Sequence, residues 1–134
     1  MTTVETLKRA LERLPSVRLA VLYGSAAKGR FGSRSDFDVG LSLEPGSNLS
    51  GSLQVTLERI TGRRVDLVVL DEAPPLLRME IAKTGRVLVE RHPYLWAEFR
   101  AHAMIDWWDW APTAQMMHRI LLTRLKEEST RGPS

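Results

Sequence analysis

Apolar residues along the chain follow two spacings, one typical of helices and one typical of strands. Val4, Leu7, Leu11 and Leu14 recur every three or four residues, which predicts an amphipathic helix that ends near Pro15. Short apolar runs between such segments predict strands. Strands are expected at residues 17–23, 36–43, 63–70 and 86–90.

Glycine and proline residues mark where the predicted elements begin and end. A helix is expected before Gly62, which suits its C-terminal cap, and Pro74–Pro75 open another helix that runs to Gly85. Helical spacing returns from about Pro93. Since proline has no N–H to donate, Pro112 predicts a break that divides this last segment into two C-terminal helices.

The alternation of helices and strands predicts an α/β or α+β fold. The chain has 134 residues, of which 43% are hydrophobic and 26% are charged, which is ordinary for a globular protein. We therefore expect a single domain over residues 1–134. Its core should span about 15–90 and its C-terminal helices about 93–128.

Composition excludes several kinds of site. The chain has no cysteine, so any metal must bind to oxygen or imidazole. It has neither an apolar run of about 18 residues nor a basic-then-apolar leader, so we expect a cytoplasmic protein without a membrane partner. The net charge of +3 is spread along the chain, which argues against a nucleic-acid partner.

Two aspartates lie two residues apart in the second predicted strand. Because strand side chains alternate, Asp36 and Asp38 share one face, while Phe37 and Val39 share the other. A divalent cation would remove the repulsion between the two carboxylates. Carboxylate oxygens suit magnesium, and this spacing can bridge two ions about 3.5–4 Å apart. The alternative is a solvated acidic pair on an edge strand.

A Gly-Ser pair ends the first predicted strand. Gly24 lets the backbone approach a ligand, and Ser25 offers a hydroxyl and the N-terminus of a short helix, where phosphate binds readily. The alternative is an ordinary strand-to-helix turn. Lys28 could offset charge on a transferring phosphoryl group, or it could be solvated. Arg30-Phe31 stands where a P-loop requires Lys-Ser/Thr, so this is not a Walker A site.

A third carboxylate interrupts the apolar run of the third predicted strand. A buried, unpaired Asp66 would be costly, so it should lie at a strand end, in an ion pair or on a metal. Arg63 and Arg64 beside it offer the ion pair. Because Asp36 and Asp38 are also present, we favour metal binding by Asp66 over an ion pair. A third carboxylate could also act as a general base.

The chain resembles the minimal nucleotidyltransferases of the DNA polymerase β superfamily. The resemblance covers about residues 17–90, and the chain length and helical tail extend it further. It rests on Gly24-Ser25-x-Ala27-Lys28-Gly29, on Ser35-Asp36-Phe37-Asp38-Val39 and on the later strand that carries Asp66. Lys28 departs from the pattern, because the family often has arginine there. The charge is kept, but a two-pronged phosphate contact is put in doubt.

The resemblance implies a nucleotidyltransferase fold, a mixed β-sheet flanked by helices. It implies two magnesium ions on Asp36, Asp38 and Asp66. It also implies transfer of a nucleoside monophosphate from an NTP to a hydroxyl, with Gly24 and Ser25 holding the β- and γ-phosphates. Small single-domain members are similar to antitoxins that add AMP from ATP to a tyrosine of a HEPN ribonuclease toxin. A HEPN-type toxin is therefore the expected partner.

The sequence is also compatible with two other functions. The same fold could neutralise a toxin by complex formation alone. It could also transfer a nucleotide to a small molecule such as an antibiotic, although the chain is short for the extra substrate domain that such enzymes tend to have.

Aromatic and methionine residues gather on both sides of Pro112. Such residues are enriched at protein interfaces, but they also lock terminal helices onto a sheet. We favour core packing, with some tryptophans exposed and available for homo- or hetero-oligomer formation. The cluster comprises Trp96, Phe99, Met104, Trp107, Trp108, Trp110, Met116 and Met117.

Overall fold

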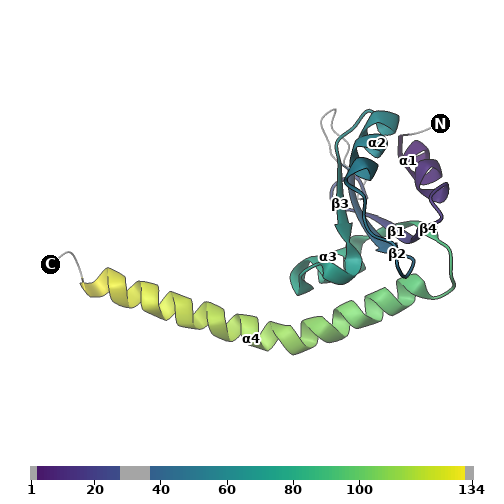
Figure 1. Cartoon of the computed structure of the whole chain (residues 1–134). Helices are drawn as coiled ribbons and strands as arrows, with labels where there is room; N and C mark the ends of the chain where they lie inside the picture. Colours follow the sequence, from purple (N-terminus) through teal and green to yellow (C-terminus); the bar gives the residue numbers. More distant parts are fainter. Residues whose placement is uncertain (1–2, 28–36, 132–134) are drawn as a thin grey trace.

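The computed structural model describes residues 3–27 and 37–131. These residues form a small α+β domain from which one long helix projects (Figure 1). The elements are α1 (Thr3–Glu12), β1 (Val17–Tyr23), β2 (Phe37–Leu43), α2 (Gly51–Thr61), β3 (Val65–Val69), the 3-10 helix η1 (Leu70–Glu72), α3 (Pro75–Thr84), β4 (Arg86–Glu90) and α4 (Leu95–Arg131).

The strands form one mixed sheet in the order β3-β2-β1-β4. β1 pairs antiparallel with β2 and β4, and β2 pairs parallel with β3. The parallel pair needs a crossover, which α2 supplies. Gly62 ends α2 in the left-handed conformation, with φ of +70°, and its N–H donates to the Glu58 carbonyl at 2.8 Å. The mixed sheet flanked by helices agrees with the fold expected from the sequence.

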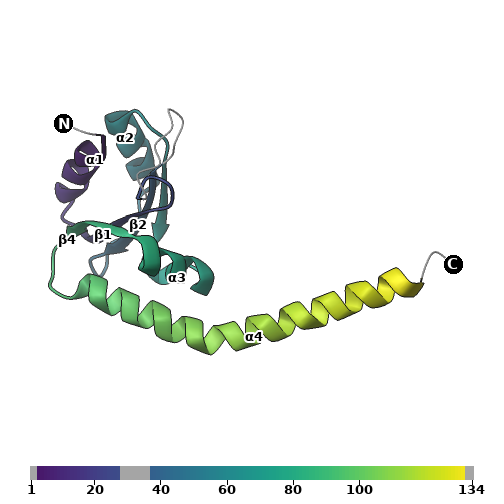
Figure 2. The same cartoon turned by 180° about the vertical axis from the view of Figure 1, so that it is seen from behind.

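Each face of the sheet has its own apolar core. Leu7 and Leu11 of α1 and Leu57 of α2 pack with Phe37 and Val39 on one face. On the other face, η1, α3 and the start of α4 pack against β1 through the cluster Leu19, Val21, Leu70, Ile81, Ala82, Phe99 and Ala103. The reverse view in Figure 2 shows the same division, with α1 and α2 on one side of the sheet and α3 and α4 on the other.

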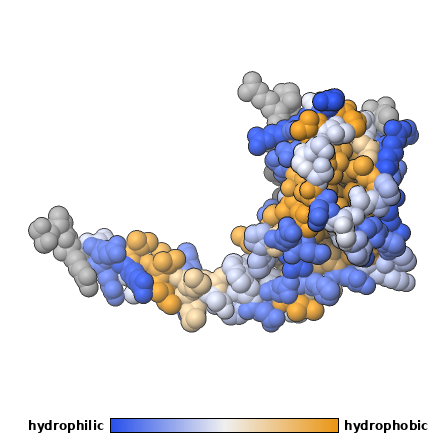
Figure 3. Space-filling view, in the orientation of Figure 1, coloured by the Kyte–Doolittle hydropathy of each residue, from blue (hydrophilic) through white to orange (hydrophobic). Residues whose placement is uncertain are grey.

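The predicted helix break at Pro112 is wrong. α4 is one helix of 37 residues with Pro112 inside it, and it ends at Arg131 rather than near residue 128. Proline removes only the hydrogen bond to the Trp108 carbonyl, and a bend relieves its clash with that turn. The helix bends near its middle in Figure 1, and apolar surface continues along its outer half in Figure 3. Within the described residues, no helix is both long and apolar enough to cross a membrane.

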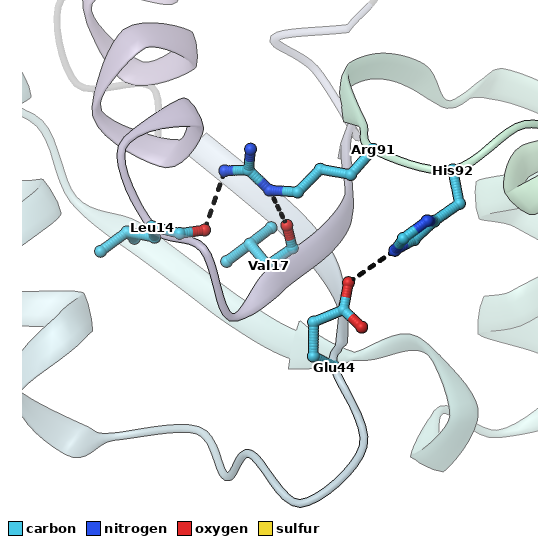
Figure 4. A network of polar contacts seen from close by, with 5 residues as sticks. All are labelled: Leu14, Val17, Glu44, Arg91 and His92. Atoms are coloured by element: carbon cyan, nitrogen blue, oxygen red, sulfur yellow. Dashed lines mark hydrogen bonds and ion pairs between the residues drawn. The ribbon is translucent and has the colours of Figure 1, made fainter.

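Arg91 ties the end of α1 to the sheet (Figure 4). Its Nε donates to the Val17 carbonyl at 2.5 Å, and its Nη2 donates to the carbonyls of Glu12 and Leu14 at 2.6 and 2.9 Å. The last carbonyls of a helix have no partner within the helix, so the guanidinium supplies donors that they lack. Next to it, His92 Nε2 lies 2.8 Å from Glu44 Oε1.

Arg91→Ala should lower the free energy of unfolding by about 2 kcal/mol, because several carbonyls lose a charged donor together. Urea denaturation measures the change. Arg59→Ala removes the same charge from an exposed position of α2 and should cost less than about 0.5 kcal/mol. Equal losses in the two variants would contradict the role given to Arg91.

Candidate functional site

Two of the three predicted carboxylates lie side by side on neighbouring strands. Asp38 of β2 is the register partner of Asp66 of β3, near the start of both strands. Adjacent strands are about 4.8 Å apart, and partners in register present their side chains to the same face. Phe37 and Val65 flank the aspartates and point into the α1–α2 core. The carboxylates therefore face the opposite side, which carries α3.

A glycine turn lies directly against Asp38. β1 ends where β2 begins, so Tyr23 is the register partner of Asp38 and Gly24 follows it. Gly24 has φ of +73°, and a Cβ atom added there would lie 2.5 Å from Asp38 Oδ2. Only glycine suits both the left-handed backbone and this close approach. The turn and the carboxylate thus form one compact unit.

The short helix predicted from Ser25 does not begin within the described residues. Ser25–Ala27 form a turn, in which Ser25 is exposed and Ala26 is buried at 2% relative exposure. The buried alanine holds the turn against the core, while the serine faces solvent. The expected helix N-terminus as a phosphate site is therefore replaced by a turn with an accessible hydroxyl and backbone.

Asp36 and Lys28 lie outside the described residues. The predicted pairing of Asp36 with Asp38 is therefore an expectation from strand alternation alone. Among the residues that are described, no group of three or more His, Asp or Glu side chains is arranged to hold a metal ion.

Asp66 is not the buried charge that its apolar neighbours suggested. Its side chain is 44% exposed, and its Oδ1 lies 3.6 Å from Arg64 Nε, whose side chain is 67% exposed. The ion pair that the sequence offered as an alternative is therefore present. Exposed ion pairs of this kind contribute about 0–1 kcal/mol to stability, so displacing Arg64 from the Asp66 carboxylate costs little free energy.

The donors at this site suit a hard divalent cation. Asp38 and Asp66 supply carboxylate oxygens from adjacent strands, and magnesium prefers such ligands. A cation bound between the two carboxylates would reduce the repulsion between their negative charges. The described residues thus fit part of a magnesium site, whose third predicted ligand is Asp36.

Residues 5–94 match the sequence profile of the family described as "Polymerase beta, Nucleotidyltransferase". The chain belongs to this family. The family assignment confirms the resemblance drawn from the sequence motifs, and the matched segment contains the Gly24 turn, both strands that carry the aspartates, and α3. A search of curated proteins finds no relative of this nucleotidyltransferase.

Solved structures share the nucleotidyltransferase's fold. A chain of a toxin–antitoxin crystal structure with AMP-PNP has a TM-score of 0.71 and 20% identity, covering 89% of this chain and 96% of that chain. A chain of the toxin–antitoxin MntA-HepT has a TM-score of 0.68 and 18% identity, covering 89% and 97%. A third structure holds a tri-AMPylated Shewanella oneidensis HEPN toxin in complex with an MNT antitoxin. Its matched chain has a TM-score of 0.66 and 16% identity, covering 88% and 98%.

Two residues that the sequence did not single out, Tyr23 and Glu80, are linked electrostatically to the candidate site. Burial raises the pKa of the half-buried Tyr23, and the charges of Asp38, Asp66 and Glu80 raise it further. Glu80 comes from α3, so a helix contributes charge to a site otherwise built on strands. Tyr23 could have been found from its place one residue before Gly24. An exposed glutamate on a helix carries no comparable signal.

Gly24→Ala should destabilise the protein more than Gly62→Ala. Both glycines have positive φ, so each substitution costs about 1 kcal/mol in backbone strain. Only Gly24 has a side chain in the way, whereas nothing lies within 4 Å of a Cβ at Gly62. Displacing Asp38 from its rotamer should add about 1 kcal/mol.

The added cost should disappear when Gly24→Ala is combined with Asp38→Ala, because the obstructing carboxylate is gone. Urea denaturation of the four variants measures this double-mutant cycle. If the extra cost persists without the carboxylate, the close approach of Gly24 to Asp38 is not its cause.

Tyr23 should titrate above the ordinary tyrosine value. The fold disfavours its phenolate, so the stability linked to Tyr23 is complete below about pH 10 and is lost as the pH rises through the raised pKa. The chain has two tyrosines, so Tyr94→Phe leaves Tyr23 as the one observed by ultraviolet absorbance. Adding Asp38→Asn should lower the Tyr23 pKa. An unchanged titration curve in Asp38→Asn would show that the Asp38 carboxylate does not raise the Tyr23 pKa.

Proposed function

We propose that this chain is a magnesium-dependent protein adenylyltransferase. It would transfer AMP from ATP to a tyrosine hydroxyl of a cognate HEPN ribonuclease toxin in the cytoplasm, and so act as the antitoxin. The observation that carries the proposal is the pairing of Asp38 with Asp66 in register, with the Gly24 turn packed against Asp38. Family membership supports nucleotidyl transfer as the class of reaction.

The reaction requires one bond to form and one to break. The acceptor's hydroxyl oxygen attacks the α-phosphorus of ATP, and the bond from that phosphorus to the oxygen bridging to the β-phosphate breaks. Pyrophosphate leaves with the electrons of that bond, and the hydroxyl proton passes to a base. Asp66 suits this last role, because its carboxylate is partly exposed near the start of β3 and can accept a proton at Oδ1 or Oδ2.

The remaining residues would position the substrates. Asp36, Asp38 and Asp66 would hold two magnesium ions, which when bound stabilise charge on the phosphates. Gly24 gives the triphosphate a close approach to backbone N–H groups, and the exposed Ser25 offers a hydroxyl to the β- and γ-phosphates. Lys28 would add a positive charge from the following loop.

The acceptor is proposed from the structures that share this fold. One of them is described as a toxin–antitoxin with AMP-PNP, and another contains an AMPylated HEPN toxin with its MNT antitoxin. A protein tyrosine of such a toxin is therefore the acceptor that we propose for this chain.

A binding-only antitoxin is the second candidate. It is favoured by one observation, the large apolar side chains that α4 exposes beyond the domain. Such a helix could neutralise a toxin without any transfer. The two functions differ in whether neutralisation depends on the carboxylates.

Asp38→Asn and Asp66→Asn should each reduce AMP transfer on the order of 100-fold or more. Each substitution removes a carboxylate that would hold magnesium, and the magnesium ions would stabilise the negative charge of the phosphates. The assay follows label from ATP into the toxin encoded beside this gene, with magnesium present. Asp71→Asn, at an exposed position in η1, is the matched control and should keep full activity. Unchanged labelling in the two site variants would refute the mechanism. Full neutralisation without any labelling would favour the binding-only antitoxin.

A further inference from the structure

The outer part of α4 makes little contact with the domain. The helix buries Phe99 and Ala103 against the sheet, and Arg78 of α3 forms an ion pair with Asp106. Beyond that ion pair, none of the α4 side chains that the structure describes is buried. Figures 1 and 2 show the helix leaving the domain as an arm. We define the outer arm as residues 104–125.

Most of the large apolar side chains that are exposed among the described residues lie on the outer arm. The arm carries ten of these fourteen side chains. They include Trp108 at 67%, Met117 at 57% and Leu125 at 59% exposure. The space-filling view shows this apolar surface on the arm (Figure 3). Large contiguous patches of exposed apolar side chains mark binding surfaces in soluble proteins.

Eight of these ten residues, all except Met104 and Leu122, lie in two stripes along the helix. At 100° per residue, the first stripe continues the side of α4 on which Phe99 and Ala103 pack against the domain. The second stripe lies on roughly the opposite side of the helix. The first comprises Trp107, Trp110, Ala114, Met117, Leu121 and Leu125, and the second comprises Ile105, Trp108, Pro112, Met116 and Ile120.

The two stripes determine what kind of partner fits. A single neighbouring helix covers one apolar stripe about 100° wide, so pairing with the arm of a second copy would leave the other stripe in water. A helix that is apolar on opposite sides is typical of one enclosed by several elements. The arm therefore suits a groove between helices better than a two-helix seam.

The outer arm lies beyond the segment that matches the family profile but within the fold shared with the toxin–antitoxin structures. The family profile stops at residue 94, whereas the likeness to the toxin–antitoxin structures covers 88–89% of this chain and so extends well into α4. The arm is thus part of the fold shared with proteins whose structures contain a toxin. It is not part of what defines the nucleotidyltransferase family.

We infer that the outer arm is the docking segment for the toxin, and that it is held in an apolar groove between helices of that partner with both stripes covered. This inference rests on the proposed function for the identity of the partner. The first stripe continues the side of α4 that packs on α3, on the sheet face of Asp38 and Asp66. A toxin bound to the arm therefore lies on the same side of the sheet as Asp38 and Asp66, which its tyrosine must reach.

Two double variants test whether both stripes are covered. Met117→Glu with Leu121→Glu places two charges in the first stripe, and Met116→Glu with Ile120→Glu places two in the second. Each pair should weaken binding to the toxin encoded beside this gene at least 100-fold, measured by calorimetry with a toxin inactivated at its ribonuclease site. All four side chains are exposed in the free chain, so the melting temperature should not change.

The control is Thr113→Glu with Gln115→Glu, which adds the same two charges at exposed positions between the stripes. It should bind within threefold of the wild type. If either stripe variant also binds within threefold of the wild type, the enclosed-arm inference is overturned. The inference is also overturned if the chain alone forms a dimer that the first-stripe variant dissociates, because a second copy then occupies the arm.

The outcome is separable from that of the proposed reaction. Toxin affinity is measured without ATP or magnesium, so it does not depend on the transfer reaction. Loss of toxin affinity in both stripe variants supports docking even if no AMP is transferred. Normal affinity in the stripe variants overturns docking even if transfer is efficient.

Discussion

The register between β2 and β3 is the constraint on which the candidate site depends. Because these strands run parallel, Asp38 and Asp66 meet near the start of both strands, and each lies between residues that point into the opposite core. A slip of one residue would turn Asp66 into the α1–α2 core and leave Asp38 alone. The α2 crossover, closed by Gly62, connects the two strands in this register.

One face of the sheet is fully packed and stabilises the fold, whereas the other face carries the carboxylates of the candidate site. α1 and α2 cover one face, where Phe37 and Val65 are completely buried, and Arg91 secures the end of α1. On the other face, α3 and α4 pack over Leu19 and Val21, while the ends that carry the carboxylates stay partly exposed. The buried face thus fixes the strand positions, and the open edge leaves room for substrates.

Much of the fold followed from local signals. Apolar runs and the glycine and proline residues at their ends placed β1, α3 and β4 correctly, because burial and turn chemistry act over a few residues. Pro112 was misjudged, since a long helix can bend around one missing hydrogen bond. The core packing favoured for the aromatic and methionine cluster was wrong for most of it, because Met104, Trp108, Trp110, Met116 and Met117 are exposed. Whether a helix packs on its own domain depends on tertiary structure.

The candidate site was predictable in its residue types but not in its pairings. Asp38 and Asp66 are far apart in sequence, and strand order decides that they meet. The ion pair between Arg64 and Asp66 was anticipated only as an alternative to a metal, and Glu80 had no signal because its contribution comes through the packing of α3. Asp36 and Lys28 stay predictions.

Metal affinity is the most direct measure of whether the paired carboxylates act together. Mn²⁺ can replace Mg²⁺ and its free form gives an electron paramagnetic resonance signal, so binding can be titrated with a non-hydrolysable ATP analogue present. Our account predicts that Asp66→Asn weakens Mn²⁺ binding at least tenfold and that Asp71→Asn does not. Equal Mn²⁺ affinity in the wild type and in Asp66→Asn would contradict it.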